Sequence, residues 1–287
     1  MTDRAPAWSL AVAAIVTVQL GVALSPRLFD IVGPAGTAWL RLTAGGLMFL
    51  AIARPRLRGY SAADLRAVII LGVITGAMLV SFLAALERLP LGTTVAIEFL
   101  GPLSVAAFRA HRRSALVWPA LALLGVLLLT EPWSGTTDVL GMLFALIAGV
   151  GWGAYILMTQ RVGDRFGGLE GLAITIPIAA LTAAIVGIPQ AWGHITLAAV
   201  GLSVALAVIA PVIPFALELI ALRRLSAATF GTLMALEPAV ATIWGAIILS
   251  QLPDWLQLSG IVIVVIAGIG AERAGRLQPA VTPTPLA

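Results

Sequence analysis

The order of apolar and polar positions divides the chain into about ten long apolar segments separated by short polar stretches. Each segment approaches the roughly 20 residues that an α-helix needs to cross a bilayer. The segments run Trp8–Leu24, Gly36–Ala53, Ala67–Leu86, Thr93–Phe108, Ala115–Leu129, Leu140–Gln160, Leu172–Ile188, Leu197–Leu219, Thr229–Ser250 and Leu256–Ala271. No connecting stretch is long enough to form a soluble domain. The pattern therefore predicts an all-α integral membrane protein with ten transmembrane helices in a lipid bilayer.

Composition agrees with this class. Hydrophobic residues make up 60% of the chain and charged residues 10%, whereas soluble domains carry roughly 25% charged residues. The pI near 10.9 would suit nucleic-acid binding, but the positive charge lies at the ends of apolar segments, so we expect no nucleic-acid partner. The chain has no cysteine, which excludes disulfides, thiol catalysis and cysteine metal sites.

The basic residues are distributed asymmetrically. All 17 are arginine. With the N-terminus in the cytoplasm, fourteen fall on the cytoplasmic side: Arg4, Arg54, Arg56, Arg58, Arg66, Arg109, Arg112, Arg113, Arg161, Arg165, Arg223, Arg224, Arg273 and Arg276. Arg27 and Arg88 fall on the other side, and Arg41 lies within a segment. The positive-inside rule then predicts that both termini are cytoplasmic and that the number of helices is even.

An internal repeat relates the two halves of the chain. The stretch "ALERLPLGTTVAIEFLGP" (Ala85–Pro102) aligns without gaps with "ALRRLSAATFGTLMALEP" (Ala221–Pro238), a shift of 136 positions from 85 to 221. These stretches lie in the fourth and ninth segments. Five is an odd number of helices, so the second copy enters the membrane inverted, as is usual in secondary transporters. We predict a 5+5 inverted repeat, with residues 1–133 and 134–273 as the repeats and 274–287 as a disordered cytoplasmic tail; chance similarity between alanine- and leucine-rich helices is the alternative.

Two acids stand beside prolines in this repeat. Glu98 precedes Pro102 by one turn, and Glu237 comes directly before Pro238. A proline removes the hydrogen bond to the carbonyl four residues earlier, so helix kinks are expected at Pro102 and Pro238. A freed carbonyl at membrane depth must face protein or water, and a buried acid costs about 2.5–3.5 kcal/mol on insertion scales. Both features predict a hydrated cavity between the halves, although the two acids could instead serve folding.

Four other polar side chains lie inside segments and are candidates for substrate binding or proton coupling. They are Gln19, Arg41, Trp152 and Tyr155. Arg41 suits a substrate carboxylate, but it could equally pair with a deep acid and hold the fold. Gln19 could join helices through hydrogen bonds, and the two aromatic residues could serve packing.

A further acid, Glu218, lies late in the eighth segment, after Pro211 and Pro214, where further kinks are expected. Because Glu218 lies within about a turn of Arg223, we expect an ion pair or gate at the cytoplasmic face rather than a substrate contact.

Three stretches carry a family resemblance: "LPLGTTVAIEFLGPLSVA", "WGAYILMTQRVG" and "PFALELIALRRLSAATFGTLMALEPAVA". They resemble the drug/metabolite transporter superfamily in its EamA branch, and within it the inner-membrane threonine/homoserine exporters of the RhtA type. The resemblance covers nearly the whole chain, and Gln19 and Arg41 fall where such exporters carry Gln and Arg. It implies two EamA-like five-helix repeats, a bacterial inner-membrane location, and export of small amino acids driven by proton exchange.

The chain departs from this family in the third segment, where the family pattern has an Asn-Tyr pair and this chain has Leu79 and Val80. If that pair touches substrate, the cargo here is more apolar. The alternatives are therefore export of bulkier amino acids, other metabolites or drugs.

The mechanism expected is alternating access. Glu98 or Glu237 would take a proton from the outside, release it to the cytoplasm, and then bind the substrate ammonium group. An enzyme is not expected, because the two histidines, His111 and His194, lie in loops. No serine–histidine pair or metal cluster is evident at membrane depth, so no cofactor or metal is expected. No pore helix or charged ring indicates a channel, and the oligomeric state stays open.

Overall fold

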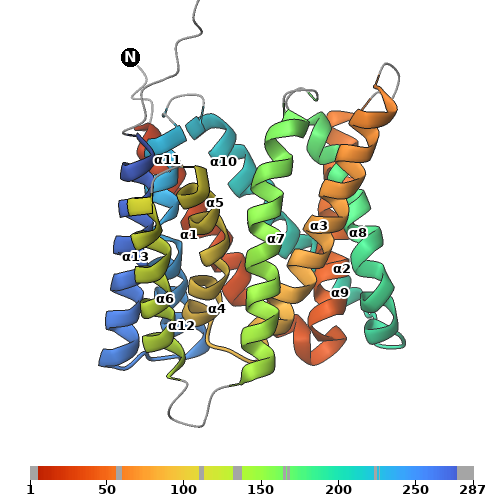
Figure 1. Ribbon diagram of the computed structural model, residues 1–287. Helices are drawn as coiled ribbons and strands as arrows, with labels where there is room; N and C mark the ends of the chain where they lie inside the picture. The colour runs from red at the N-terminus through yellow and green to blue at the C-terminus, as the bar shows by residue number, and fades with distance from the viewer. Residues whose placement is uncertain are drawn as a thin grey trace, which may run out of the picture.

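The computed structural model describes residues 6–55, 60–109, 113–131, 138–163, 166, 169–222, 225 and 227–276. Every regular element in these ranges is a helix, and the helices stand side by side as one bundle (Figure 1). Six described spans are long and apolar enough to cross a membrane, and four shorter apolar helices complete ten crossing segments. This agrees with the ten transmembrane helices predicted from the sequence.

Six crossing segments each consist of one element, of which α2 contains a break at Gly33: α1 (Ala7–Leu24), α2 (Pro26–Ala53), α3 (Ala62–Leu86), α7 (Val139–Gly163), α8 (Glu170–Ala191) and α13 (Trp255–Arg276). The fifth begins as η1 (Arg113–Leu116) and continues as α6 (Val117–Thr130). Three are interrupted: α4 (Leu91–Glu98) with α5 (Leu100–Arg109), α9 (Leu197–Ala207) with η2 (Val208–Val212) and α10 (Ile213–Leu222), and α11 (Ala227–Met234) with α12 (Glu237–Leu249). Because α13 continues to Arg276, residues 274–276 are helical, whereas the sequence analysis assigned them to the tail; residues 277–287 lie outside the described ranges.

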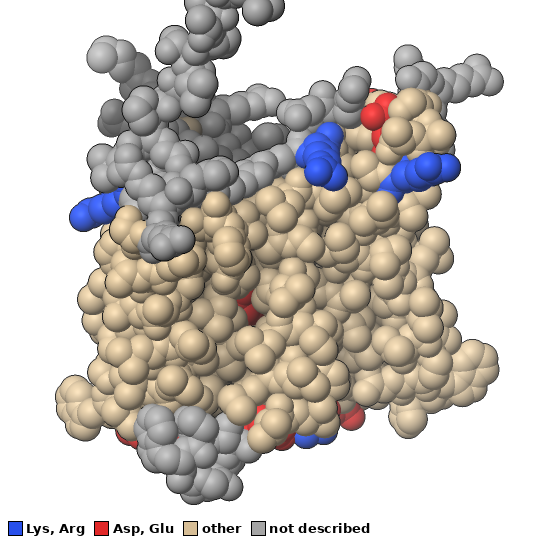
Figure 2. Space-filling view, in the orientation of Figure 1, with Lys and Arg blue, Asp and Glu red and all other residues tan. Residues whose placement is uncertain are grey.

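The bundle has two ends. We call the end that carries the start of α1 and the end of α13 the N-terminal end, and the opposite end, where α4 begins and α12 ends, the far end (Figure 1). The visible charged side chains gather mainly at these two ends, and the surface between them is almost wholly uncharged (Figure 2) and carries many large exposed hydrophobic side chains. This is the surface expected of a protein surrounded by hydrocarbon.

Helix contacts follow a regular pattern across the bundle. α2 packs along α8, the fourth crossing segment along the ninth through α4 and α12, and α6 along α13. α3 contacts α7 and α8, while the α9–α10 segment contacts α1 and α2. α7 contacts α4 and α5, and α1 contacts α11 and α12. Some of these crossings are close at glycines: the backbones of α6 and α13 meet at Gly125 and Gly260, where an added Cβ on either residue would lie within 2.7 Å of the other's carbonyl oxygen.

An ion pair at the far end ties the start of α7 to the end of α3. Arg88 Nη1 donates to Asp138 Oδ2 at 3.0 Å, and the Gly141 backbone N–H donates to Asp138 Oδ1 at 2.8 Å. The Gly141 N–H and the Arg88 guanidinium hold the pKa of Asp138 below its usual range. Asp138 therefore stays ionised at neutral pH and serves as the N-cap of α7.

The second crossing segment begins earlier than its apolar pattern predicts. α2 starts at Pro26 rather than near Gly36 and is broken at Gly33, which has φ of 72° and precedes Pro34. The Gln190 side chain of α8 repairs the break, because its Oε1 accepts from the backbone N–H groups of Ala35 and Gly36 at 2.7 and 3.1 Å. These amides head the helix after the break and have no helical acceptor.

We expect Gly33→Ala to destabilise the protein. A Cβ at this position would lie 2.3 Å from Gln190 Cδ, and the backbone is in the left-handed region that favours glycine. Moving Gln190 away would also leave two amides unpaired, for a total of about 1–3 kcal/mol. Thermal unfolding in detergent should show a clearly lower midpoint. Gly201→Ala is the control, because no atom lies within 4 Å of a Cβ there; equal midpoints for the two variants would contradict the expectation.

Candidate functional site

The fourth crossing segment is broken beside its acid. α4 ends at Glu98 and α5 begins at Leu100. Because Pro102 has no N–H, the Glu98 carbonyl has no helical donor. The backbone of α7 lies against this break: a Cβ on Gly149 would be 2.9 Å from the Glu98 carbonyl oxygen, and a Cβ on Gly101 would be 1.8 Å from the Gly149 carbonyl oxygen. Glu98 itself is partly exposed.

The ninth crossing segment is broken at the corresponding place. α11 ends at Met234 and α12 begins at Glu237, with Pro238 in its first turn. Proline is well tolerated there, because first-turn amides have no helical acceptor. Glu237 is 8% exposed. Its carboxylate lies at a helix N-terminus, where the helix dipole favours negative charge.

Packing leaves no room for an acid at the position of the fourth segment that aligns with Glu237. Under the 136-residue shift, Glu237 corresponds to Gly101 and Glu98 to Met234. Position 101 cannot carry a side chain, because α7 is in backbone contact there. The acid of the fourth segment is therefore placed at residue 98, on the other side of the break.

Glu98 and Glu218 are each within electrostatic range of Glu237. The charges of Glu98 and Glu218 act on Glu237, and that of Glu218 also acts on Tyr155. We call Glu98, Glu218 and Glu237 the acid cluster. Within the described ranges, the recorded ion pair is the one between Arg88 and Asp138, and no basic side chain lies within 4.0 Å of the cluster's oxygens. Figure 2 shows acidic atoms set back in a recess of the apolar surface at mid-height.

The expected partner of Glu218 cannot be placed, because Arg223 lies outside the described residues. Glu218 is itself partly exposed on α10. What the structure adds is its neighbourhood: the charge of Glu218 acts on Glu237 and on Tyr155. A group of three carboxyl groups without a described basic partner favours a cationic ligand or bound protons.

Arg41 repairs the break in the eighth crossing segment. η2 contains Pro211, and Ala210 has a non-helical backbone. Pro214 has no N–H, so the Ala210 carbonyl has no helical donor. Arg41 Nη2 donates to that carbonyl at 3.2 Å, and Nη1 donates to Ser25 Oγ at 2.7 Å. Arg41 is 3% exposed and forms no ion pair with a described acid. Of the roles considered above, this geometry favours holding the fold, through a carbonyl rather than through an acid.

We expect Arg41→Met to reduce stability more than it changes transport selectivity. The variant would leave the Ala210 carbonyl buried without a donor, at about 1–3 kcal/mol. The thermal midpoint in detergent should fall, and the folded fraction should transport the same cargoes in the same order of preference. A stable Arg41→Met protein that no longer distinguishes amino acids from their methyl esters would contradict this role, since it would assign Arg41 to the substrate carboxylate.

Two other predicted site residues lie near the acid cluster. The Trp152 ring is edge-on to Phe99, with centroids 6.2 Å apart, so it lies against the break that follows Glu98. Tyr155 is one turn further along α7 and packs among side chains of α3 and α8. Gln19 of α1 is 4% exposed, and its Oε1 has no described hydrogen-bond donor. A buried amide oxygen without a donor is a place where a ligand N–H could bind.

The two residues that depart from the family pattern lie near the centre of the protein. Leu79 and Val80 of α3 are partly buried and pack against two apolar clusters. One cluster joins α1, α3, α4 and α12, and the other joins α2 and α8. A polar side chain at either position would therefore alter the surroundings of both apolar clusters.

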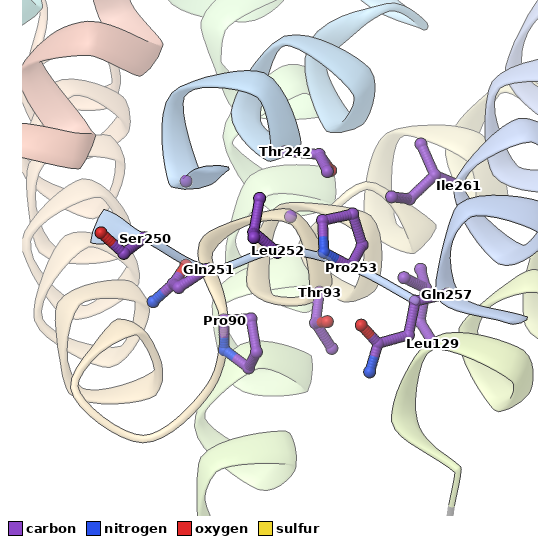
Figure 3. Close-up of a pocket in the computed structure, with 12 residues that line it drawn as sticks. Pro90, Thr93, Leu129, Thr242, Ser250, Gln251, Leu252, Pro253, Gln257 and Ile261 are labelled. Carbon is purple, nitrogen blue, oxygen red and sulfur yellow. The ribbon is translucent and has the colours of Figure 1, made fainter. Parts of the chain in front are cut away.

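Sequence reasoning missed a cavity of about 330 Å³ at the far end. We call it the far-end cavity; α4, α6, α12 and α13 line it, together with the stretch that joins α12 to α13 (Figure 3). Gln251 from this stretch accepts from the Leu91 N–H at 2.9 Å, which caps α4. The one signal available was Thr93, which the repeat matches to Thr229 but which had no assigned role.

Comparison with known proteins gives a consistent picture. Residues 139–270 match the EamA-like transporter family. The threonine/homoserine exporter RhtA of Salmonella typhimurium (strain SL1344) is 33% identical over 290 residues, covering 97% of this chain and 96% of that protein. RhtA of Escherichia coli (strain K12) is 34% identical over 287 residues, covering 96% and 95%. A crystal structure with 19% identity has a TM-score of 0.64 and covers 94% of this chain and 98% of its own, a likeness of fold.

Proposed function

Because this chain belongs to the EamA-like transporter family, we propose that it exports small amino acids, threonine- or homoserine-like, in exchange for protons. Relatives that match almost its whole length are threonine/homoserine exporters. The observation that carries the proposal is the acid cluster, in which the charges of Glu98 and Glu218 act on Glu237 and no described basic side chain pairs with any of the three. Such a site suits either protons or a substrate ammonium group, and exchange requires that it accept both in turn.

Helix bounds and contacts support the 5+5 inverted repeat. Adding 136 to the bounds of α4 gives 227 and 234, which are the bounds of α11. The contacts are also matched: α3 with α7 corresponds to the α9–α10 segment with α1, and α3 with α8 corresponds to that segment with α2. The contacts of α2 with α8, and of α6 with α13, correspond to themselves, as expected for pairs that lie across a two-fold axis.

An asymmetry within this repeat supports a conformation that is closed at the far end. Residues Leu91–Ile97 of α4 are all buried, and α4 packs against α12. The corresponding contact at the N-terminal end would join α11 to α5, and the described residues form no comparable contact there. Several residues of α11 are only partly buried. If the arginine-rich N-terminal end is cytoplasmic, this is a state that opens towards the cytoplasm.

The proposed cycle uses the protein's own acids. In the state open to the cytoplasm, ionised Glu98 and Glu237 bind the amino acid's ammonium group. The loaded protein then opens at the far end, which we propose faces the outside, and releases its cargo there. Protons from the outside neutralise the acids, and the neutral site returns inward. Neutralisation matters because moving an uncompensated carboxylate through a closed, dry intermediate costs several kcal/mol.

Counterflow in proteoliposomes tests this function. Vesicles loaded with unlabelled homoserine would be offered trace labelled homoserine, threonine, leucine or phenylalanine, with and without an imposed pH gradient. We expect homoserine or threonine to accumulate and the gradient to change the rate. Lack of accumulation of every amino acid by folded protein would overturn the proposal.

Bulkier apolar amino acids are the second candidate cargo. Leu79 and Val80 favour them, because both lie at the meeting place of the helices that surround the centre. In the same assay, preference for leucine or phenylalanine over homoserine would select this candidate.

A further inference from the structure

The far-end cavity lies apart from the acid cluster. None of the three cluster acids lines it, and two of the helices around it, α6 and α13, carry none of these acids. No charged side chain lines the cavity, and its polar lining consists of hydroxyl and carboxamide groups. A volume of about 330 Å³ accommodates a small organic molecule.

One wall of the cavity is the first turn of α4. Leu91 N–H is used by Gln251, but Gly92 and Thr93, which line the cavity, are also first-turn residues whose amides have no helical acceptor. Thr93 as a residue is 5% exposed and lines the cavity, and no hydrogen bond of its hydroxyl is recorded among the described residues. Figure 3 places the Thr93 hydroxyl and the Gln257 carboxamide towards the same space between α4 and α13. A hydroxyl that faces a cavity beside a helix N-terminus is suited to an anionic group.

On the opposite wall, the lining residue Gln257 has a carboxylate behind it. Gln257 lines the cavity, and its Nε2 donates to Glu131 Oε1 at 3.5 Å. The Gln257 backbone N–H donates to Asp254 Oδ1 at 2.8 Å, which caps α13. The end carbonyls of α6 and α12 are also at this end of the bundle. Carboxylates and helix C-termini favour a positive group, so the cavity has one wall for each end of a zwitterion.

We propose that the far-end cavity is a second ligand site that binds a small α-amino acid from the outer side of the membrane. The ligand carboxylate receives hydrogen bonds from the first turn of α4, including the Thr93 hydroxyl. The ligand ammonium group faces Gln257 and the carboxylates behind it. The ligand class rests on the proposed function, whereas the site itself rests on the cavity and on Thr93.

Such a ligand would act on the closed far end. It would contact α4, α12 and α13 together, and α4 and α12 must separate for this end to open. External amino acid bound here would therefore favour the closed state and slow export. This is inhibition by the exported compound at a site other than the acid cluster.

The test is equilibrium binding of labelled homoserine to the full chain in detergent, in a Glu98→Gln, Glu237→Gln background that disables the acid cluster. We expect saturable binding to persist in this background. Adding Thr93→Val should weaken it about tenfold or more, the loss expected for one hydrogen bond to a charged group. Thr94→Val is the matched control, because Thr94 does not line the cavity and its hydroxyl donates to the carbonyl of Pro90, the N-cap residue of α4.

A ligand analogue without the carboxylate tests whether the Thr93 wall binds that group. Homoserine methyl ester, which lacks the carboxylate, should compete poorly with homoserine for the background protein that retains Thr93. In the protein that also carries Thr93→Val, the disadvantage of the ester relative to homoserine should be no larger. Equal binding by the Thr93→Val and Thr94→Val proteins would overturn the site, as would loss of saturable binding in the folded background protein.

The outcome is distinguishable from that of the proposed function. If wild-type protein exports homoserine but the background variant binds none, the far-end site fails and the function stands. If wild-type protein transports no amino acid but the background variant binds homoserine in a Thr93-dependent way, the function fails and the site stands.

Discussion

Gradient-driven export should fall to the rate of protein-free liposomes when Glu98→Gln and Glu237→Gln are combined. Glutamine keeps the size and hydrogen-bonding capacity of glutamate but can neither carry a proton nor attract an ammonium group. Glu98 and Glu237 lie at the breaks of the fourth and ninth crossing segments, and their charges interact. Removing both leaves Glu218 as the one member of the cluster, without the pair that the exchange requires. The measurement is uptake of labelled homoserine against an imposed pH gradient.

Single variants and a distant acid make this prediction specific. Glu87→Gln serves as a control, because Glu87 is an exposed acid at the end of α3, and this variant should transport like wild type. The single variants show which acid responds to the gradient: one that still performs counterflow but ignores the pH gradient has lost the proton site. Gradient-driven export by the folded double variant at the wild-type rate would exclude these acids as proton carriers.

A disulfide between α4 and α12 should stop transport, and a reductant should restore it. A Cβ on Gly245 would lie 3.5 Å from Leu91 Cβ, at the lower end of the usual Cβ–Cβ range for disulfides. Because the chain has no cysteine, Leu91→Cys with Gly245→Cys creates the one pair that can form. The linked protein could not separate its closed far end, so we expect complete loss of counterflow under oxidising conditions. Counterflow before and after addition of reductant is the measurement.

A second cysteine pair keeps the prediction testable if the first double-cysteine variant does not fold. A Cβ on Gly92 would lie 3.1 Å from Thr242 Cβ, so Gly92→Cys with Thr242→Cys should link after a small adjustment. The four single-cysteine variants should show no effect of oxidant. Full counterflow by either completely linked pair would mean that the far end does not need to open at α4 and α12, and alternating access between the two halves would then be wrong.

The helices were predictable from the sequence because the hydrocarbon core of a bilayer permits few backbone conformations. A segment of apolar residues in a bilayer must be helical, so the ten crossing segments follow from length and composition alone. The interruptions beside Pro102, Pro211 and Pro238 were predictable for the same reason, since proline chemistry is local. The break at Gly33 was not, because it depends on Gln190, a residue of another helix whose side chain supplies the missing acceptor.

The candidate site was only partly within reach of the sequence. Single acids in apolar segments are conspicuous, so Glu98 and Glu237 could be identified, whereas their proximity to Glu218 is a property of the packed bundle. Arg41 shows the limit most clearly, because its partner is a backbone carbonyl of η2, and carbonyls have no signature in a sequence. The far-end cavity is lined by residues as far apart as Thr93 and Gln257, and each is unremarkable in its own segment.

The contact between Gly101 and Gly149 has a consequence for how the two halves can be combined. In the proposed repeat, a homodimer of two second halves would bring the equivalent of Glu237 to the place where Gly101 meets the Gly149 carbonyl. Even a Cβ would lie 1.8 Å from that oxygen, so a glutamate could not be accommodated. The second half therefore cannot pair with itself in this geometry, and it needs a first half with glycine at that position. We therefore expect the two proposed halves to complement each other, so that a gene split at their junction requires both products in the same cell.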